Sequence, residues 1–116
     1  MASEPAGTPK ATSYNFGKLF TILYEEAAEG DLRAFRAYDV RRILDEVDAQ
    51  LTTAPLNPSR RRKRLEGLIP PWNSMRPVWQ LRVGDFRVFY DVDEEQQAVI
   101  VRAIRPKGTR TTEEIL

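Results

Sequence analysis

The stretch from residue 78 to residue 93 constrains the fold of this chain more than any other part of the sequence. Two runs rich in β-branched and aromatic residues flank Gly84-Asp85. A glycine at the first central position suits the two-residue type II′ turn of a β-hairpin. Such a turn fixes the register of the strands and places Arg82 opposite Arg87. The sequence therefore predicts an antiparallel hairpin with a defined register.

The two faces of this hairpin differ, because side chains alternate sides along a strand. One face is apolar and needs a core: Trp79, Leu81, Val83, Phe86, Val88, Tyr90 and Val92. The other face carries Val78, Gln80, Arg82, Arg87, Phe89 and Asp91. Arginines opposite each other repel unless an anion or an acidic partner neutralises them. We expect the first face to be buried and the arginine face to stay open.

Length and composition are those of one small soluble domain. The chain has 116 residues, of which 41% are hydrophobic and 30% charged. No apolar run approaches the roughly 18 residues that span a membrane, and the N-terminus lacks the pattern of a signal peptide, so we expect a cytoplasmic protein without membrane contact. Small residues, polar residues and prolines predict a disordered tail over residues 1–13 and a single domain over residues 14–116.

The absence of Cys and His limits the chemistry of the chain. Disulfides, thiolate nucleophiles and metal sites built from Cys or His are excluded, and so is the commonest general acid–base. Any catalysis has to use Arg, Lys, carboxylate, Tyr or hydroxyl groups. We expect neither a metal nor a cofactor.

Two helices are predicted ahead of the hairpin, as an antiparallel pair over one side of a sheet. Residues 25–35 begin with acids, which the helix dipole favours, although Gly30 weakens this helix. Asp39 is the expected N-cap of the second helix. Its apolar residues recur at helical spacing: Val40, Ile43, Leu44, Val47 and Leu51. Residues 19–24 form either a first strand or the start of the first helix.

The remaining elements indicate an α+β fold, with two N-terminal helices packed on one face of a small antiparallel sheet. Residues 98–104 are apolar on both faces and predict a central or covered strand. The tail from Thr111 predicts a capped helical turn. Five consecutive basic residues precede the hairpin, in an expected loop or helix start: Arg60, Arg61, Arg62, Lys63 and Arg64.

Charge is unevenly distributed, although the net charge is only +1. Residues 25–48 carry eight acids against four arginines, whereas residues 57–87 carry eight basic residues against two acids. The asymmetry indicates an anionic partner for the basic part, and residues 60–64 would then contact a phosphate backbone. A solvated loop or an interface with an acidic protein explains the same five residues equally well.

The order of elements and three motifs resemble the RelE/ParE toxin superfamily of bacterial type II toxin–antitoxin modules. These motifs are Leu44-Asp45-Glu46-Val47, Arg64-Leu65-Glu66-Gly67 and the hairpin from Leu81 to Val92, and the resemblance covers roughly residues 19–116. It implies a RelE/ParE-like fold and a toxin that a cognate antitoxin neutralises. RelE-like members cut mRNA in the ribosomal A site, and ParE-like members inhibit DNA gyrase without being nucleases.

The resemblance also implies site residues. Arg87 matches the arginine of the second hairpin strand, Lys107 matches a later basic residue, and Arg82 lies opposite Arg87. Cleavage by the RNA 2′-hydroxyl needs no metal, but it needs cations around the phosphate. These three are the candidate catalytic residues, and residues 60–64 are the candidate RNA-binding residues. An ion pair of Arg87 with Asp85 or Asp91, and a solvated Lys107, are the alternatives.

The chain departs from the nuclease pattern in two places. Val78 and Gln80 stand where RelE-like nucleases present lysines, and Glu113 or its neighbours stand where many have Tyr or His. We expect a ribosome-dependent mRNA interferase, a metal-independent endoribonuclease acting on mRNA. The alternatives are a ParE-like gyrase inhibitor and a member that only binds.

Trp72 could stack on a base, whereas Trp79 lies on the apolar face and belongs to the core.

Overall fold

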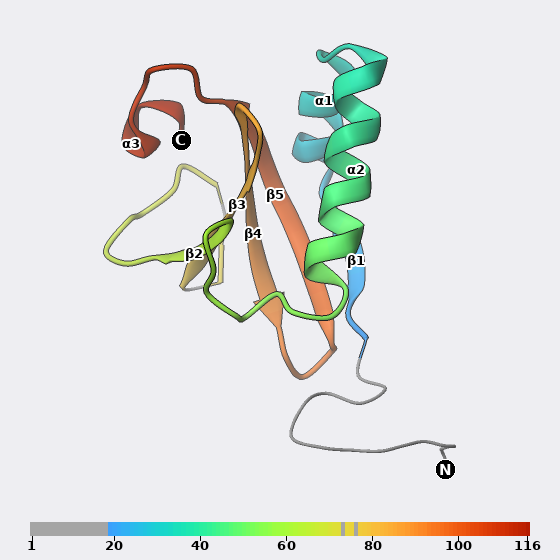
Figure 1. The fold of residues 1–116 in the computed structure, drawn as a ribbon. Coiled ribbons are helices and arrows are strands. Elements are labelled where there is room, and N and C mark those ends of the chain that lie inside the picture. Colours follow the sequence, from blue (N-terminus) through green and yellow to red (C-terminus); the bar gives the residue numbers. More distant parts are fainter. Residues whose placement is uncertain (1–18, 73, 76) are drawn as a thin grey trace.

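The computed structural model describes residues 19–116 apart from 73 and 76, and the expected tail over residues 1–13 lies outside this part. No helix in the described part is long and apolar enough to cross a membrane. The elements follow one another along the chain (Figure 1): β1 (Thr21–Tyr24), α1 (Glu26–Arg33), α2 (Ala37–Leu51), β2 (Arg62–Leu65), β3 (Val78–Val83), β4 (Phe86–Asp93), β5 (Ala98–Pro106) and α3 (Thr112–Ile115).

The strands form one sheet in the order β1-β5-β4-β3-β2. The two N-terminal helices lie together on one side of it (Figure 1), which confirms the α+β prediction. From β2 to β5 every pairing is antiparallel, whereas β1 joins β5 in parallel. A parallel pairing needs a long connection, and the elements from α1 to β4 supply it. Residues 19–24 therefore contribute a strand rather than the start of a helix, and β5 has a strand on each side as expected.

The hairpin has the predicted register, with Arg82 opposite Arg87. Gly84 has φ +57°, as the first central position of a type II′ turn requires. The apolar face of the hairpin packs under α2, where Ile43, Val47 and Leu51 are fully buried. The main core thus follows from the two periodicities read in the sequence.

The second helix starts earlier than predicted, and Asp39 is not its N-cap. The N-cap is Arg36, and Asp39 lies in the first turn, with its carboxylate 3.4 Å from the Arg36 Nε. An acid is favourable both as a cap and in the first turn, so its presence does not fix the starting residue. Gly30 does not interrupt α1.

The second face of the sheet is not fully open, contrary to expectation. A smaller core forms there from Leu65, Val78, Phe89, Ala103 and Ile115. The apolar side chains of this face need cover, and α3 supplies it through Ile115. The capped turn predicted from Thr111 is confirmed, because Thr111 and Glu114 form a reciprocal capping box. At the turn end of this face Arg82 is exposed and Arg87 is half-buried.

The predicted loop or helix start at the five basic residues is wrong for most of them, because Arg62–Leu65 forms β2 at the edge of the sheet. Arg and Lys have little preference for strands, so local sequence does not announce this element. Its backbone pairs with β3, and Arg62 lies opposite Leu81. Charged side chains on an edge strand also discourage pairing with another chain.

Candidate functional site

The three candidate catalytic residues lie at one end of the sheet, around the turn between β3 and β4. Arg82 and Arg87 are cross-strand neighbours. Lys107 follows β5, and its backbone N–H donates to the Asp85 carbonyl over 2.8 Å. The Gly108 N–H donates to the Asp85 side chain over 3.1 Å. The turn is thus fastened to the segment that carries Lys107.

A row of arginines crosses three strands at this end. Arg82 on β3 faces Arg87 on β4, which in turn faces Arg105 on β5. Arg105 is neutralised by Asp31 of α1 over 2.6 Å. Within the described residues, neither Arg82 nor Arg87 forms a salt bridge. The row therefore keeps two positive charges next to each other, neither of them in a salt bridge within the described residues.

Arg87 is held by backbone carbonyls rather than by an acid. Its Nη1 donates to the carbonyls of Gly84 and Phe86, each over 2.9 Å. Burial lowers the pKa of Arg87, the charge of Arg82 lowers it further, and Asp85 opposes both. A guanidinium remains charged despite such a shift, so repulsion persists and an anion bound here would relieve it.

Asp91, the other partner considered for Arg87, belongs to a separate buried network. Its Oδ2 accepts from Arg102 over 2.7 Å and from the Met75 N–H over 2.8 Å, and Arg102 also contacts Glu25 over 2.6 Å. Burial raises the pKa of Asp91, against the opposing effects of the Met75 and Arg102 hydrogen bonds. This network ties β4 and β5 to the start of α1 and has a structural role.

The positions of the two nuclease lysines are closed. Val78 is 2% exposed and Gln80 is 6% exposed, beneath the C-terminal segment. The Thr112 hydroxyl donates to the Gln80 side-chain oxygen over 3.3 Å. Chemistry on a bound RNA strand would therefore have to take place at the turn end of this sheet face.

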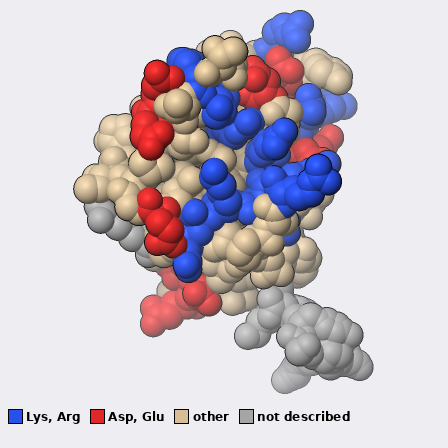
Figure 2. Space-filling model, turned by 60° about the vertical axis from the view of Figure 1, so that its left-hand side comes forward, with Lys and Arg blue, Asp and Glu red and all other residues tan. Residues whose placement is uncertain are grey.

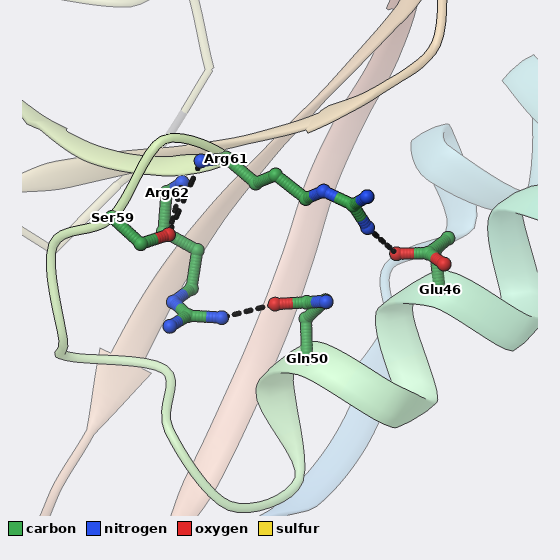
Figure 3. Close-up of polar contacts among 5 residues, drawn as sticks. All are labelled: Glu46, Gln50, Ser59, Arg61 and Arg62. Atoms are coloured by element: carbon green, nitrogen blue, oxygen red, sulfur yellow. Dashed lines mark hydrogen bonds and ion pairs between the residues drawn. The ribbon is translucent and has the colours of Figure 1, made fainter.

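A basic cleft lies between α2 and the hairpin turn, with a volume of about 560 Å³. We call it the arginine cleft, and it is lined by Arg42, Glu46, Arg60, Arg61, Arg82, Val83 and Gly84. Figure 2 shows Lys and Arg side chains gathered across one face of the molecule. Glu46 is the single acid in the lining, and it pairs with Arg61 over 3.0 Å (Figure 3).

The five predicted RNA-binding residues do not form one patch. Arg60 and Arg61 line the cleft, whereas Arg62 turns toward the end of α2 and bonds Gln50 (Figure 3). Arg61 and Arg62 thus bond α2 residues one helical turn apart, Glu46 and Gln50. Lys63 is exposed opposite the buried Gln80, and Arg64 pairs with Glu66 over 2.6 Å.

Arg42 was missed by sequence reasoning, which took α2 only as a core helix. The adjacent Arg41-Arg42 on its polar face was the available signal. A Cβ atom at Gly84 would lie 2.7 Å from both terminal nitrogens of Arg42. The glycine of the turn therefore leaves room for this guanidinium to pack against the turn.

Neither tryptophan is presented for base stacking. Trp79 is 4% exposed in the main core, as expected. Trp72 packs on Phe89, with ring centroids 5.5 Å apart, and the Arg105 guanidinium lies 5.9 Å from its ring centroid. Trp72 thus belongs to the smaller core.

Known proteins resemble the chain in sequence and in fold. A family model described as the ParE toxin of type II toxin–antitoxin system, parDE, matches residues 22–108. A comparison with curated protein sequences gave no match.

Solved structures match the fold at low identity. The RelBE2 toxin–antitoxin complex from Mycobacterium tuberculosis is 20% identical with a TM-score of 0.59, over 74% of this chain and 88% of that chain. The archaeal RelE–RelB complex from Pyrococcus horikoshii OT3 is 19% identical with a TM-score of 0.57, over 78% and 98%. The isolated RelE toxin of E. coli is 17% identical with a TM-score of 0.51, over 82% and 90%.

Proposed function

The chain belongs to the ParE toxin family of type II toxin–antitoxin systems, and we propose, from the chemistry of its basic site, that it inhibits translation by ribosome-dependent cleavage of mRNA. One observation carries the proposal. Arg82 and Arg87 lie side by side at the accessible end of the sheet without a salt bridge among the described residues, and Lys107 is fastened to the same turn. Such an arrangement suits a phosphate group.

The chemistry that this site supports is electrostatic. In metal-independent cleavage the RNA 2′-hydroxyl loses its proton, its oxygen bonds to phosphorus, and the bond to the 5′-oxygen breaks as that oxygen takes up a proton, while negative charge builds on the phosphate. Arg87 can hold two phosphate oxygens with its planar guanidinium, and Arg82 and Lys107 add positive charge beside it. Gly84 and Phe86 fix the Arg87 guanidinium before the substrate arrives.

A cognate antitoxin is the second proposed partner. The similar structures from M. tuberculosis and P. horikoshii are toxin–antitoxin complexes. An antitoxin that binds this chain would neutralise it, and expression of the chain without its antitoxin should arrest growth.

Controlled expression tests this function. Wild type should stop protein synthesis, and mapped 5′ ends of mRNA should fall within codons that occupy the ribosomal A site. Removing one preorganised cation typically lowers such a rate by about 100-fold, so we expect Arg87→Gln to lose most cleavage. Arg33→Gln on α1 removes the same charge at an exposed site and should behave as wild type. Arrested synthesis with intact mRNA would refute the nuclease.

Inhibition of DNA gyrase is the competing function, and a specific observation favours it. Val78 and Gln80 replace the two nuclease lysines and are buried, so the usual acid–base equipment of the nuclease branch is missing. In this case the purified toxin would block supercoiling of relaxed plasmid by gyrase and leave translation intact. Unaffected supercoiling at a toxin concentration that stops translation would exclude it.

A further inference from the structure

We propose that the arginine cleft, together with Tyr38, is a binding site for single-stranded RNA, with phosphates in the cleft and a base stacked on the Tyr38 ring. The inference rests on the proposed action on mRNA at the ribosome, and it adds a second contact with RNA beside the hairpin end. The site uses two residues of α2, Arg42 and Tyr38, that the phosphate chemistry at the hairpin end does not require.

The charge of the cleft fits phosphate. Of its four arginines, only Arg61 has an acidic partner among the described residues, and that partner is Glu46. Arg42, Arg60 and Arg82 line the same hollow with exposed side chains. Guanidinium groups bind phosphate oxygens in pairs, and several around one hollow can follow consecutive phosphates of a strand.

The Arg42 guanidinium packs against the hairpin turn although its side chain is exposed. Its guanidinium packs against Gly84, where a Cβ would come within 2.7 Å of it. The turn thus holds a cation of α2 directly beside the hairpin. A cation held in place loses less side-chain entropy when it binds an anion.

Tyr38 supplies a surface for a base. It is 72% exposed, and it lies one helical turn before Arg42 on α2. Both residues line a second hollow of about 310 Å³, which shares Arg42 and Glu46 with the arginine cleft. A phosphate site next to an exposed aromatic ring is the arrangement by which proteins hold single strands with little sequence preference.

The two RNA contacts are continuous. Arg82 lines the cleft and also faces Arg87 across the hairpin. An RNA strand that enters past Tyr38 and crosses the cleft would therefore reach the hairpin end. A single strand fits better than a duplex, because stacking on a side chain requires a base that is not already stacked in a helix.

Fluorescence anisotropy of the purified full chain with a labelled ten-nucleotide oligouridine tests the site. Arg42→Gln should weaken binding several-fold and lower the slope of log affinity against log salt by about 0.7, the value for one lost phosphate contact on a single strand. Tyr38→Ala should weaken binding about tenfold with an unchanged slope, and Tyr38→Phe should bind as wild type. Arg33→Gln, an exposed arginine outside the cleft, is the matched charge control.

The proposal is overturned if Arg42→Gln and Tyr38→Ala bind the oligonucleotide as the control does, or if a duplex of equal length binds as tightly. It is also overturned if a labelled polyglutamate peptide binds with the same dependence on Arg42 while the RNA does not bind. The measurements distinguish failure of this RNA site from failure of the proposed nuclease activity. RNA binding that depends on Arg42 and Tyr38, with translation unaffected by wild type, would leave the site standing and refute the nuclease.

Discussion

At the scale of single residues, Arg82 and Arg87 show that the charge needed to bind an anion also lowers the stability of the folded sheet. Like charges opposite each other on two strands destabilise the sheet, and neither arginine forms a salt bridge within the described residues. The sequence alone predicted this pair, because a two-residue turn fixes the register. It could not predict that Arg87 bonds backbone carbonyls, since this depends on the shape of the turn.

Arg82→Gln should therefore increase stability while it reduces function. Removing one of two facing charges is expected to raise the free energy of unfolding by about 0.2–1 kcal/mol. Urea denaturation at low salt measures the change, and it should shrink as salt screens the repulsion. Equal or lower stability than wild type at low salt would show that Arg82 is already compensated.

Tyr24 gives a pH-dependent prediction. Burial, with a contribution from Asp48, raises the pKa of Tyr24 from 10.0 to about 12. Between these values the folded chain keeps the phenol proton and the unfolded chain releases it, so stability falls as pH rises through this window. Tyr24→Phe should flatten the fall in urea midpoint above pH 10, whereas removing the exposed hydroxyl in Tyr38→Phe should not. A Tyr24→Phe curve parallel to wild type would contradict the shift.

At the scale of elements, local patterns predicted the hairpin, the core of α2 and the capped turn α3, because each is specified by residues close in sequence. The strand β2 was not predictable in this way. It exists because its backbone pairs with β3, which is distant in sequence, and its Arg and Lys residues have no preference for strands. Cover of the second sheet face was missed for a related reason: Ile115 reaches Val78 and Phe89 only after the whole chain has folded.

Ile115→Ala should detach α3 from the sheet. Ile115 is 3% exposed in the smaller core, and large-to-small changes at such sites cost about 2–5 kcal/mol. Because a four-residue helix has little stability of its own, we expect hydrogen exchange to speed up at α3 and at Gln80 beneath it. Thr112→Val keeps the size of its side chain, removes the bond to Gln80 and should have a smaller effect. Unchanged exchange in Ile115→Ala would show that α3 is held by other contacts.

At the scale of the whole molecule, the fold separates a working surface from its support. The helices and the apolar hairpin face form the main core, while α3, Leu68 and Trp72 close most of the other face. What remains accessible is the end of the sheet and the adjoining arginine cleft. The uneven charge read in the sequence indicated a basic surface, but Arg42 comes from the acidic part of the chain and joins it only through the packing of α2 on the hairpin turn.

Cleavage of mRNA on the ribosome by this basic surface can be measured in a purified system. Ribosomes would be stalled with a defined codon of a labelled mRNA in the A site and incubated with folded wild type, Arg87→Gln or Arg33→Gln. Wild type and Arg33→Gln should cut inside that codon, and Arg87→Gln should cut there about 100-fold more slowly. An mRNA that stays intact with wild type, or is cut equally fast by Arg87→Gln, would contradict cleavage by this surface.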